Sequence, residues 1–564
     1  MTNKNESSNE QSGLSEDLVK AKKPSISSRR AFVVAASAGG LGVLVAKQAQ
    51  AITEGPLNPT QRRDRAFQIR SDRATANRNA TNLTVQPTNG DEEQLANKIG
   101  NFTKGLPHDL NTGEVNIAAF NTLDFAIRTG TPAAFEAVTL GGTRKLTNPQ
   151  AGLAFEMEGG DGPAFKIPAP PKFNSREMAA EIAENYWMAL LRDVPFSQYP
   201  ASQIAIDAAA DLNVFGVDAK VPKNSSGLVT PDLLFRGFTP GDRVGPWLAQ
   251  FFYQPCPFGA NLVEQRIRHP LPGVNFMTDW NSFVTVQNGV DPGGLAFENV
   301  LRYMRDGRGL GEWVHVDVLF QAYFMAFLVL SGLGAPVDAA NPYKTSAKQA
   351  GFATFGGPHI ATLLCEVSTR ALHATWYQKW FAHRRVRPEA FAGAIHARLN
   401  RGLTVDRAPV HQDILTSINS STRLGRYLAP GNALLPMAFA EGSPTHPSYT
   451  AGHATVAGAC TTILKAFFDE SFVIPNALQP SDDGLSLLPF TAAPLTVGGE
   501  LNKIASNIAN ARNVAGVHWR SDSTNSMNLG EAIAIQLMQE HKATFNESFA
   551  GHSLTKFDGT TITI

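Results

Sequence analysis

Three short segments in the C-terminal half of the chain place cationic side chains beside histidines. They span residues 379–388, 446–453 and 512–522. Lysine and arginine side chains neutralise and orient the oxygens of tetrahedral anions, and Arg387 offers a planar fork that suits a pair of oxygens. Gly452 allows a backbone N–H to approach an anion closely because it carries no side chain. The three segments together therefore predict a site for an oxyanion.

The histidines in these segments add proton transfer and ligation. His453 has a side chain that exchanges a proton near neutral pH. His518 offers a lone pair to the central atom of the anion, and Asp522, four residues on, would fix its tautomer. Arg512 lies six residues before His518, about 240° around a straight helix. Both reach one site only if the helix breaks between them, and Gly516 permits such a break.

Taken singly, each feature has an ordinary structural explanation. Lysines and arginines near helix ends are usually solvated, and a histidine beside a glycine is usually structural. An arginine and a histidine six residues apart occur together by chance in many chains. The specific signal is the order in which all of these residues follow one another.

That order is K-x(7)-R-P, then G-H, then R-x(5)-H-x(3)-D. It resembles the superfamily that unites vanadium-dependent haloperoxidases with bacterial acid phosphatases and lipid phosphatases. Within it, the chain is most similar to the algal and cyanobacterial bromoperoxidases. The similarity extends to segments outside the site, at residues 104–108, 176–196, 305–308 and 313–317. It covers most of residues 55–545.

The resemblance implies a role for each site residue. Vanadate oxygens would be bound by three cations and one backbone N–H, those of Lys379, Arg387, Arg512 and Gly452. His518 would be the protein ligand to vanadium, supported by Asp522. His453 would be the acid–base residue, and His446 would tune His453 or the halide site.

The reaction implied is that of a vanadate-dependent haloperoxidase with one vanadate per subunit. Hydrogen peroxide bound to vanadate, polarised by Lys379, would oxidise bromide to hypohalous acid, which halogenates an organic acceptor. Chloride and iodide are alternative halides. A structural calcium and a homo-oligomer are also implied. The alternative function is an acid phosphatase in which His518 forms a phosphohistidine. A third alternative is an oxyanion-binding scaffold without turnover.

The chain departs from the family pattern immediately before Gly452. The family usually has Pro-Ser there, with the serine donating to a vanadate oxygen, whereas this chain has Thr450-Ala451. Losing that donor costs about 1–3 kcal/mol of oxyanion stabilisation unless another group replaces it. The aromatic residues around Lys379 suit either a halide pocket or core packing; they are Trp376, Trp380 and Phe381.

Two further features lie outside the predicted site. His315 and Asp317 lie two residues apart in an apolar stretch that we expect to be a buried helix, so they would not face each other. A structural role is therefore expected for both. Cys256 lies between two prolines, and we expect it at the surface, where it would be able to bridge two subunits.

The elements that must position these residues are mostly helical. Helical spacing of apolar residues predicts an all-α fold of helical bundles, with two four-helix bundles, long loops and one minor β-hairpin at 555–564. Helices are expected at 174–192, where Asn174 to Glu177 form a capping box, and at 201–213, 296–305, 313–333, 346–381, 388–400, 448–468, 499–515 and 525–541.

We divide the chain into a signal peptide, 1–51, and a haloperoxidase domain, 52–564. The domain would comprise N-terminal arm and loops (52–172), an N-terminal helical half (173–345), the vanadate-binding helical half (346–545) and a C-terminal tail (546–564). Arg29 and Arg30 precede an apolar run and an Ala-Gln-Ala site, which resembles a twin-arginine export signal. The mature protein would then be periplasmic or extracellular.

Composition narrows the function classes. The 564 residues are 43% hydrophobic and 17% charged, with 49 basic and 49 acidic side chains. The hydrophobic fraction is high enough for a large buried core. The equal numbers of basic and acidic side chains argue against a nucleic-acid partner, whose binding requires a basic excess. No later segment is apolar enough to predict a membrane span in the mature chain. With three cysteines, the chain is not a disulfide-built scaffold.

Overall fold

The computed structural model describes residues 55–80 and 85–564, so the predicted export signal lies outside the described residues. Contacts divide the chain into two units, Met1–Asp64 and Arg65–Ile564. Helix α1 (Pro59–Ala80) crosses the boundary between the two units. The expected mainly helical fold is confirmed, while the finer subdivision of residues 52–564 remains a prediction. In the described part of the chain, no helix is both long and apolar enough to cross a bilayer.

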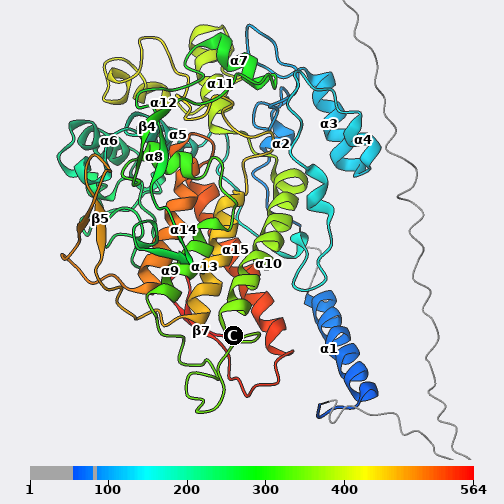
Figure 1. The fold of residues 1–564 in the computed structure, drawn as a ribbon. Coiled ribbons are helices and arrows are strands. Elements are labelled where there is room, and N and C mark those ends of the chain that lie inside the picture. The colour runs from blue at the N-terminus through cyan, green and yellow to red at the C-terminus, as the bar shows by residue number, and fades with distance from the viewer. Residues whose placement is uncertain (1–54, 81–84) are drawn as a thin grey trace, which may run out of the picture. The chain divides into compact units, whose positions relative to one another are not determined.

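Four helices of the C-terminal half form the bundle that carries the site. They are α10 (Gly357–Tyr377), α13 (Gly452–Phe467), α14 (Val497–Val514) and α15 (Arg520–Lys542). Helix α13 contacts each of the other three, as the ribbon in Figure 1 illustrates. It is buried along almost its whole length.

Two glycines let α13 and α15 approach each other closely. A Cβ atom at Gly458 would lie 2.0 Å from the carbonyl oxygen of Met527, and one at Gly530 would lie 1.9 Å from that of Thr455. Because backbone atoms cannot move aside cheaply, only glycine fits at either position. This contact sets the depth at which Gly452 and His453, at the start of α13, sit in the molecule.

A second group of helices gathers around α5 (Arg176–Leu190), which contacts α6 (Gln203–Val214), α11 (Pro388–Asn400) and α12 (Gln412–Ser417). Of the expected capping box over Asn174 to Glu177, only an N-cap hydrogen bond is present. Ser175, not Asn174, is the N-cap, and its side chain accepts a hydrogen bond from the N–H of Met178. The remaining α-helices are α2 (Asp91–Gln94), α3 (Ile117–Thr129), α4 (Pro132–Glu136), α7 (Trp280–Gln287), α8 (Gly307–Trp313) and α9 (Gln321–Gly332).

The described β-structure consists of short antiparallel pairs. The expected C-terminal hairpin is confirmed as β7 (Ser553–Thr555) and β8 (Thr561–Thr563). Three more pairs were not predicted: β1 (Cys256–Phe258) with β2 (Asn261–Val263), β3 (Ile267–Pro270) with β4 (Phe297–Arg302), and β5 (Leu478–Pro480) with β6 (Leu487–Pro489). Strands of three to six residues are too short for period-2 alternation to appear.

Three predictions about this part of the chain are wrong. The helix expected over 296–305 is absent, because residues 297–302 form strand β4 and pair with β3. The expected helix over 313–333 exists only as α9, since α8 ends at Trp313 and residues 314–320 form a turn segment. Cys256 is 1% exposed, because its position at the start of β1 packs it against α9. It is therefore not a surface thiol.

Candidate active site

Lys379 lies in the π-helical turn Gln378–His383 that continues α10. Its side chain is fully buried, and Nζ donates hydrogen bonds to the carbonyl oxygens of Pro447 (2.7 Å) and Ser448 (2.8 Å). These two bonds tie the ammonium to the loop before α13 and leave one proton for a further partner. Burial lowers the pKa of Lys379 well below its usual value, and the nearby Arg387 lowers it further.

Arg387 is the N-cap residue of α11, and Pro388 begins that helix. Its guanidinium donates to the carbonyl oxygens of Val517 (2.7 Å) and His446 (2.8 Å). Nη1 also lies 3.0 Å from Nε2 of His518. Burial lowers the pKa of Arg387 to about 9, so the group is still a cation at neutral pH.

Arg512 comes from the last turn of α14 and is the third cation. Nη1 donates to the carbonyl oxygen of Val314 at 2.7 Å, and the guanidinium lies 5.6 Å from the centre of the Phe439 ring. Nε is buried and has no hydrogen-bond partner among the described residues. Such an unpaired charged donor is costly to bury. The electrostatics therefore favour an anion beside Arg512.

The chain breaks between Arg512 and His518 as the spacing requires. Helix α14 ends at Val514, α15 begins at Arg520, and Gly516 between them has φ of +85°. This left-handed conformation suits glycine. The break brings Arg512 and His518 to the same site from opposite sides of a tight turn.

His518 has two ring nitrogens with different partners. Nδ1 lies 2.8 Å from Oδ2 of Asp522, and because a carboxylate only accepts, Nδ1 carries the proton. Nε2 is unprotonated and accepts a hydrogen bond from Nη1 of Arg387 at 3.0 Å, because arginine only donates. Burial holds the pKa of His518 well below its usual value, with the positive charge of Arg387 adding to the effect. The result is a neutral imidazole that offers Nε2 as a ligand.

Asp522 is held by more groups than the sequence indicated. Arg385 donates to it at 2.6 Å and also to Glu181 at 2.8 Å, and the hydroxyl of Ser448 donates to its other oxygen. The sequence does not distinguish Arg385, because it is one of three arginines in 384–387 and spacing does not show which way its side chain points. Ser448 supports His518 through Asp522 and so does not replace the missing serine at position 451.

His453 projects from the first turn of α13 beside the backbone of Gly452. Its Nε2 lies 2.8 Å from Oδ1 of Asp317, whose side chain is 3% exposed. Burial alone would raise the pKa of Asp317, but its interactions with His453 and Arg512 together outweigh burial and leave that pKa below its usual value. Asp317 was expected to be structural. That prediction is wrong because it assumed one helix over 313–333. Asp317 instead lies in the turn between α8 and α9, and this turn directs its side chain at the site.

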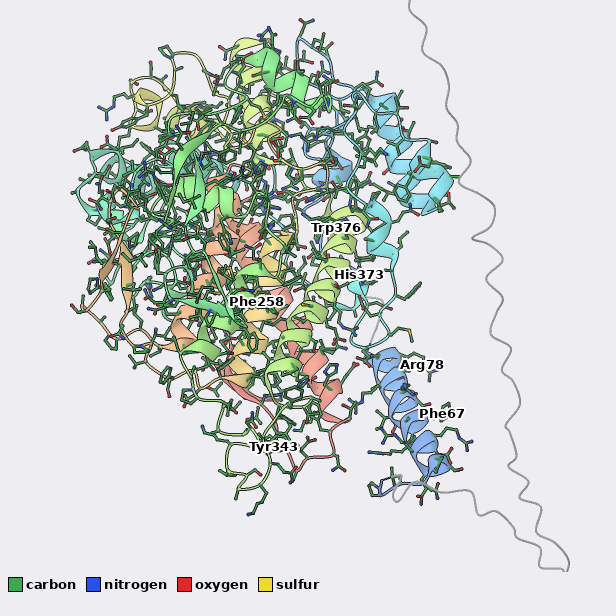
Figure 2. The ribbon with its side chains drawn as sticks, in the orientation of Figure 1. Phe67, Arg78, Phe258, Tyr343, His373 and Trp376 are labelled. Carbon is green, nitrogen blue, oxygen red and sulfur yellow. The ribbon has the colours of Figure 1, made fainter. Side chains whose placement is uncertain are left out.

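His446 lies at the site through contacts with a cation and an aromatic ring. Its Nδ1 is 2.9 Å from Nη2 of Arg387, and its ring centre is 5.0 Å from that of Trp376 on α10 (labelled in Figure 2). Burial lowers the pKa of His446 well below its usual value. Trp380 belongs to a hydrophobic cluster with Phe102, and both Trp376 and Phe381 pack against that cluster; Trp376 in addition contacts His446.

Gly452 and Ala451 define the departure from the family pattern. A Cβ atom at Gly452 would lie within 3.5–3.7 Å of the side chains of Leu372, Trp376 and Leu319, so this side of the glycine is lined by apolar groups. Ala451 is fully buried, and its N–H donates to Ser526. No hydroxyl stands at position 451 itself.

The assembled site has one chemical character. Three buried cations surround a neutral imidazole whose unprotonated Nε2 accepts a hydrogen bond from Arg387, and a His–Asp pair lies beside them near the start of α13. Such a donor set fits a tetrahedral oxyanion whose central atom accepts a nitrogen ligand. The structure thus brings together all of the residues predicted for the site: Lys379, Arg387, His446, Gly452, His453, Arg512, His518 and Asp522.

Known proteins with similar sequences and structures are vanadium-dependent bromoperoxidases. Residues 362–547 match a family model described as the VCPO second helical-bundle domain. The chain is 38% identical over 545 residues to the vanadium-dependent bromoperoxidase of Corallina pilulifera, covering 83% of this chain and 91% of that protein. It is 35% identical over 544 residues to the vanadium-dependent bromoperoxidase of Ascophyllum nodosum, covering 91% and 95%.

A solved structure agrees over nearly the whole chain. The second vanadate-dependent bromoperoxidase of Ascophyllum nodosum, described as homohexameric, superposes with a TM-score of 0.83 at 30% identity. The match covers 93% of this chain and 95% of the other.

Proposed function

The chain belongs to the family of vanadium-dependent bromoperoxidases, and we propose that its site binds one vanadate per subunit and uses hydrogen peroxide to oxidise bromide to hypobromous acid. The observation that carries this proposal is the orientation of His518. Its Nδ1–H donates to Asp522, so Nε2 is unprotonated and, in place of its hydrogen bond from Arg387, would bind vanadium among three cations.

Vanadate fits the groups that the site provides. Lys379, Arg387 and Arg512 would balance the negative charge of its oxygens, and the backbone N–H of Gly452 would donate to one of them. Bound vanadate supplies Lewis acidity that activates hydrogen peroxide towards attack by a halide.

The protein's own contribution is positioning, charge balance and proton transfer. Asp317 holds His453 by its Nε2, so that the ring stands ready to take up a proton from peroxide. Lys379, fixed by two carbonyl oxygens, directs its remaining proton into the site and would polarise bound peroxide.

Bromide is the halide we propose, with chloride and iodide as further substrates. Trp376 and His446 border the site and form the group best placed to select among halides. The hypohalous acid would then halogenate an organic acceptor.

We also propose export by the twin-arginine route and a homo-oligomeric assembly, supported by the arginine pair before the apolar run and by the hexameric relative. A structural calcium has weaker support. Among the described residues, the one grouping of three potential metal ligands is Glu158, Glu366 and His541, and Arg370 already pairs with both glutamates.

The test is bromination of a phenolic dye by the metal-free protein with bromide and peroxide, with and without orthovanadate. Bromination that vanadate restores and phosphate suppresses would support the proposal, and His518→Ala should abolish it. If vanadate restores no bromination, and the protein instead hydrolyses p-nitrophenyl phosphate, the same cage would serve an acid phosphatase with His518 as nucleophile.

A further inference from the structure

We propose that His315 is a positioning residue of this site: it joins the turn segment 314–320, which orients Arg512 and His453, to the loop 437–451 that leads into α13. The inference rests on the proposed function, because it concerns how the oxyanion site is held in shape. From the sequence alone, only a structural role is expected for His315.

The turn segment holds two of the site's groups through different atoms. The carbonyl oxygen of Val314 accepts a hydrogen bond from Arg512 at 2.7 Å, and the carboxylate of Asp317 lies 2.8 Å from His453. The segment lies between α8, which ends at Trp313, and α9, which begins at Gln321. No helix or strand ladder fixes it, so its shape depends on side-chain anchors.

His315 is such an anchor, since it contacts carboxylates from two elements. Nε2 lies 2.6 Å from Glu441 on the loop before α13, and Nδ1 lies 3.3 Å from Glu312 in α8. Because carboxylates only accept hydrogen bonds, both ring nitrogens donate, and the ring is an imidazolium. The ring also stacks on Phe439 of the same loop at 3.8 Å and an angle of 6°.

Phe439 connects this anchor to Arg512. The Arg512 guanidinium carbon lies 5.6 Å from the centre of the ring on which His315 stacks, within the range of cation–π attraction. The loop is further held by Lys104, whose Nζ donates to the carbonyl oxygen of Glu441. Loss of His315 would therefore loosen the turn segment and the Phe439 ring together, and both contact Arg512.

The charge of His315 persists well above neutral pH. Burial alone would lower its pKa, but hydrogen bonds to Glu312 and Glu441 outweigh burial and raise the pKa to about 9. The charged groups around this anchor are Arg144 and Arg512, which both interact electrostatically with Glu441, and Asp317 on the turn segment itself. Since the folded pKa is raised, the anchor is complete below the unfolded value of 6.5 and is lost as pH rises through about 9.

The experiment measures orthovanadate binding to the metal-free protein by calorimetry for the wild type, His315→Gln, His315→Lys and His373→Gln. His373 is the matched control. It lies on α10, outside the turn segment, and forms a similar part-buried pair with Glu156. We expect His315→Gln to weaken binding about tenfold at pH 7. His315→Lys, which restores a cation, should recover part of the loss, and His373→Gln should change binding less than about twofold.

The ratio of the His315→Gln and wild-type dissociation constants should fall towards one above pH 9, because both then lack the charge. Unchanged affinity in His315→Gln, an equal loss in His373→Gln, or a ratio independent of pH would each overturn the proposal. Bromination by the wild type, measured in parallel, separates the two levels of inference. If the wild type does not brominate, the proposed function is wrong. If the wild type brominates and His315→Gln binds vanadate as tightly as the wild type, only the role of His315 is wrong.

Discussion

At the scale of single residues, the site separates groups that bind an oxyanion from the group that moves a proton. Lys379, Arg387 and Arg512 reach the site as cations held by backbone carbonyl oxygens. His453 is held by a carboxylate. Carbonyl partners fix a cation's position without cancelling its charge, so the charge is kept for the anion.

His453→Ala tests the division between binding and proton transfer. We expect vanadate affinity within a few-fold of the wild type, because the three cations and His518 are unchanged, and a fall in turnover of about 10²–10⁴ from the loss of general acid–base assistance. Steady-state bromination and calorimetry measure the two quantities. Asp317→Asn should lower turnover less, since His453 stays present but loses its anchor. An undiminished rate in His453→Ala would remove it as the acid–base residue.

Ala451→Ser tests the departure from the family pattern. A serine hydroxyl at this buried position would add a donor to the charged oxyanion, worth about 1–3 kcal/mol and so on the order of tenfold in vanadate affinity. Ala457→Ser, also fully buried on α13, is the matched control for placing a hydroxyl in this helix. If Ala451→Ser binds no more tightly, another donor or a water already serves that oxygen.

At the scale of elements, the turns between helices decide which side chains meet. The break at Gly516 was predictable, because a straight helix cannot bring Arg512 and His518 together and a glycine stood between them. The turn at 314–320 was not, because its apolar composition continues into α9 and no glycine or proline marks it. The prediction of the site therefore succeeded where a turn residue was visible, and it missed Asp317 and His315 where tertiary contacts alone end the helix.

Strand β4 was not predictable for the same reason, because tertiary contacts and not a local pattern decide its structure. Residues 297–302 contain valine, leucine and phenylalanine at spacings that suit either a helix or a strand. Only the pairing with β3, which lies almost thirty residues earlier, decides between them, and no local pattern encodes that partner. The long amphipathic helices of the bundle were predictable because their apolar periodicity extends over many turns.

Gly516→Ala tests the helix break. An alanine at φ of +85° costs about 1–2 kcal/mol, and its Cβ would lie 2.9 Å from the sulfur of Met437. We expect a lower thermal midpoint and weaker vanadate binding, because relief of the strain shifts Arg512 relative to His518. Gly402→Ala is the control, since Gly402 has φ of +72° and open space around its Cβ position. Gly402→Ala should lose similar stability and keep its vanadate affinity. If Gly516→Ala also keeps its vanadate affinity, the break at Gly516 does not position Arg512 relative to His518.

At the scale of the whole molecule, the buried cations must be stabilised by the fold around them. Burial lowers the pKa of Arg387 to about 9 and that of Arg512 to about 10, and the positive charge of Arg512 adds to the lowering at Arg387. The close packing of α13 against its neighbours keeps water from screening that repulsion. An oxyanion that binds only the folded protein should relieve it and raise stability.

Thermal unfolding with increasing oxyanion therefore tests the site as a unit. A ligand at 100 times its dissociation constant stabilises the folded state by about 2.7 kcal/mol, and the midpoint should rise with the logarithm of its concentration. Vanadate should stabilise more than phosphate at equal concentration, because we propose that only vanadate gains a bond to His518. His518→Ala should reduce the vanadate increment to that of phosphate, whereas Arg512→Gln should reduce both. Equal increments for the two anions in the wild type would mean that the cations bind the oxyanion without any ligation by His518.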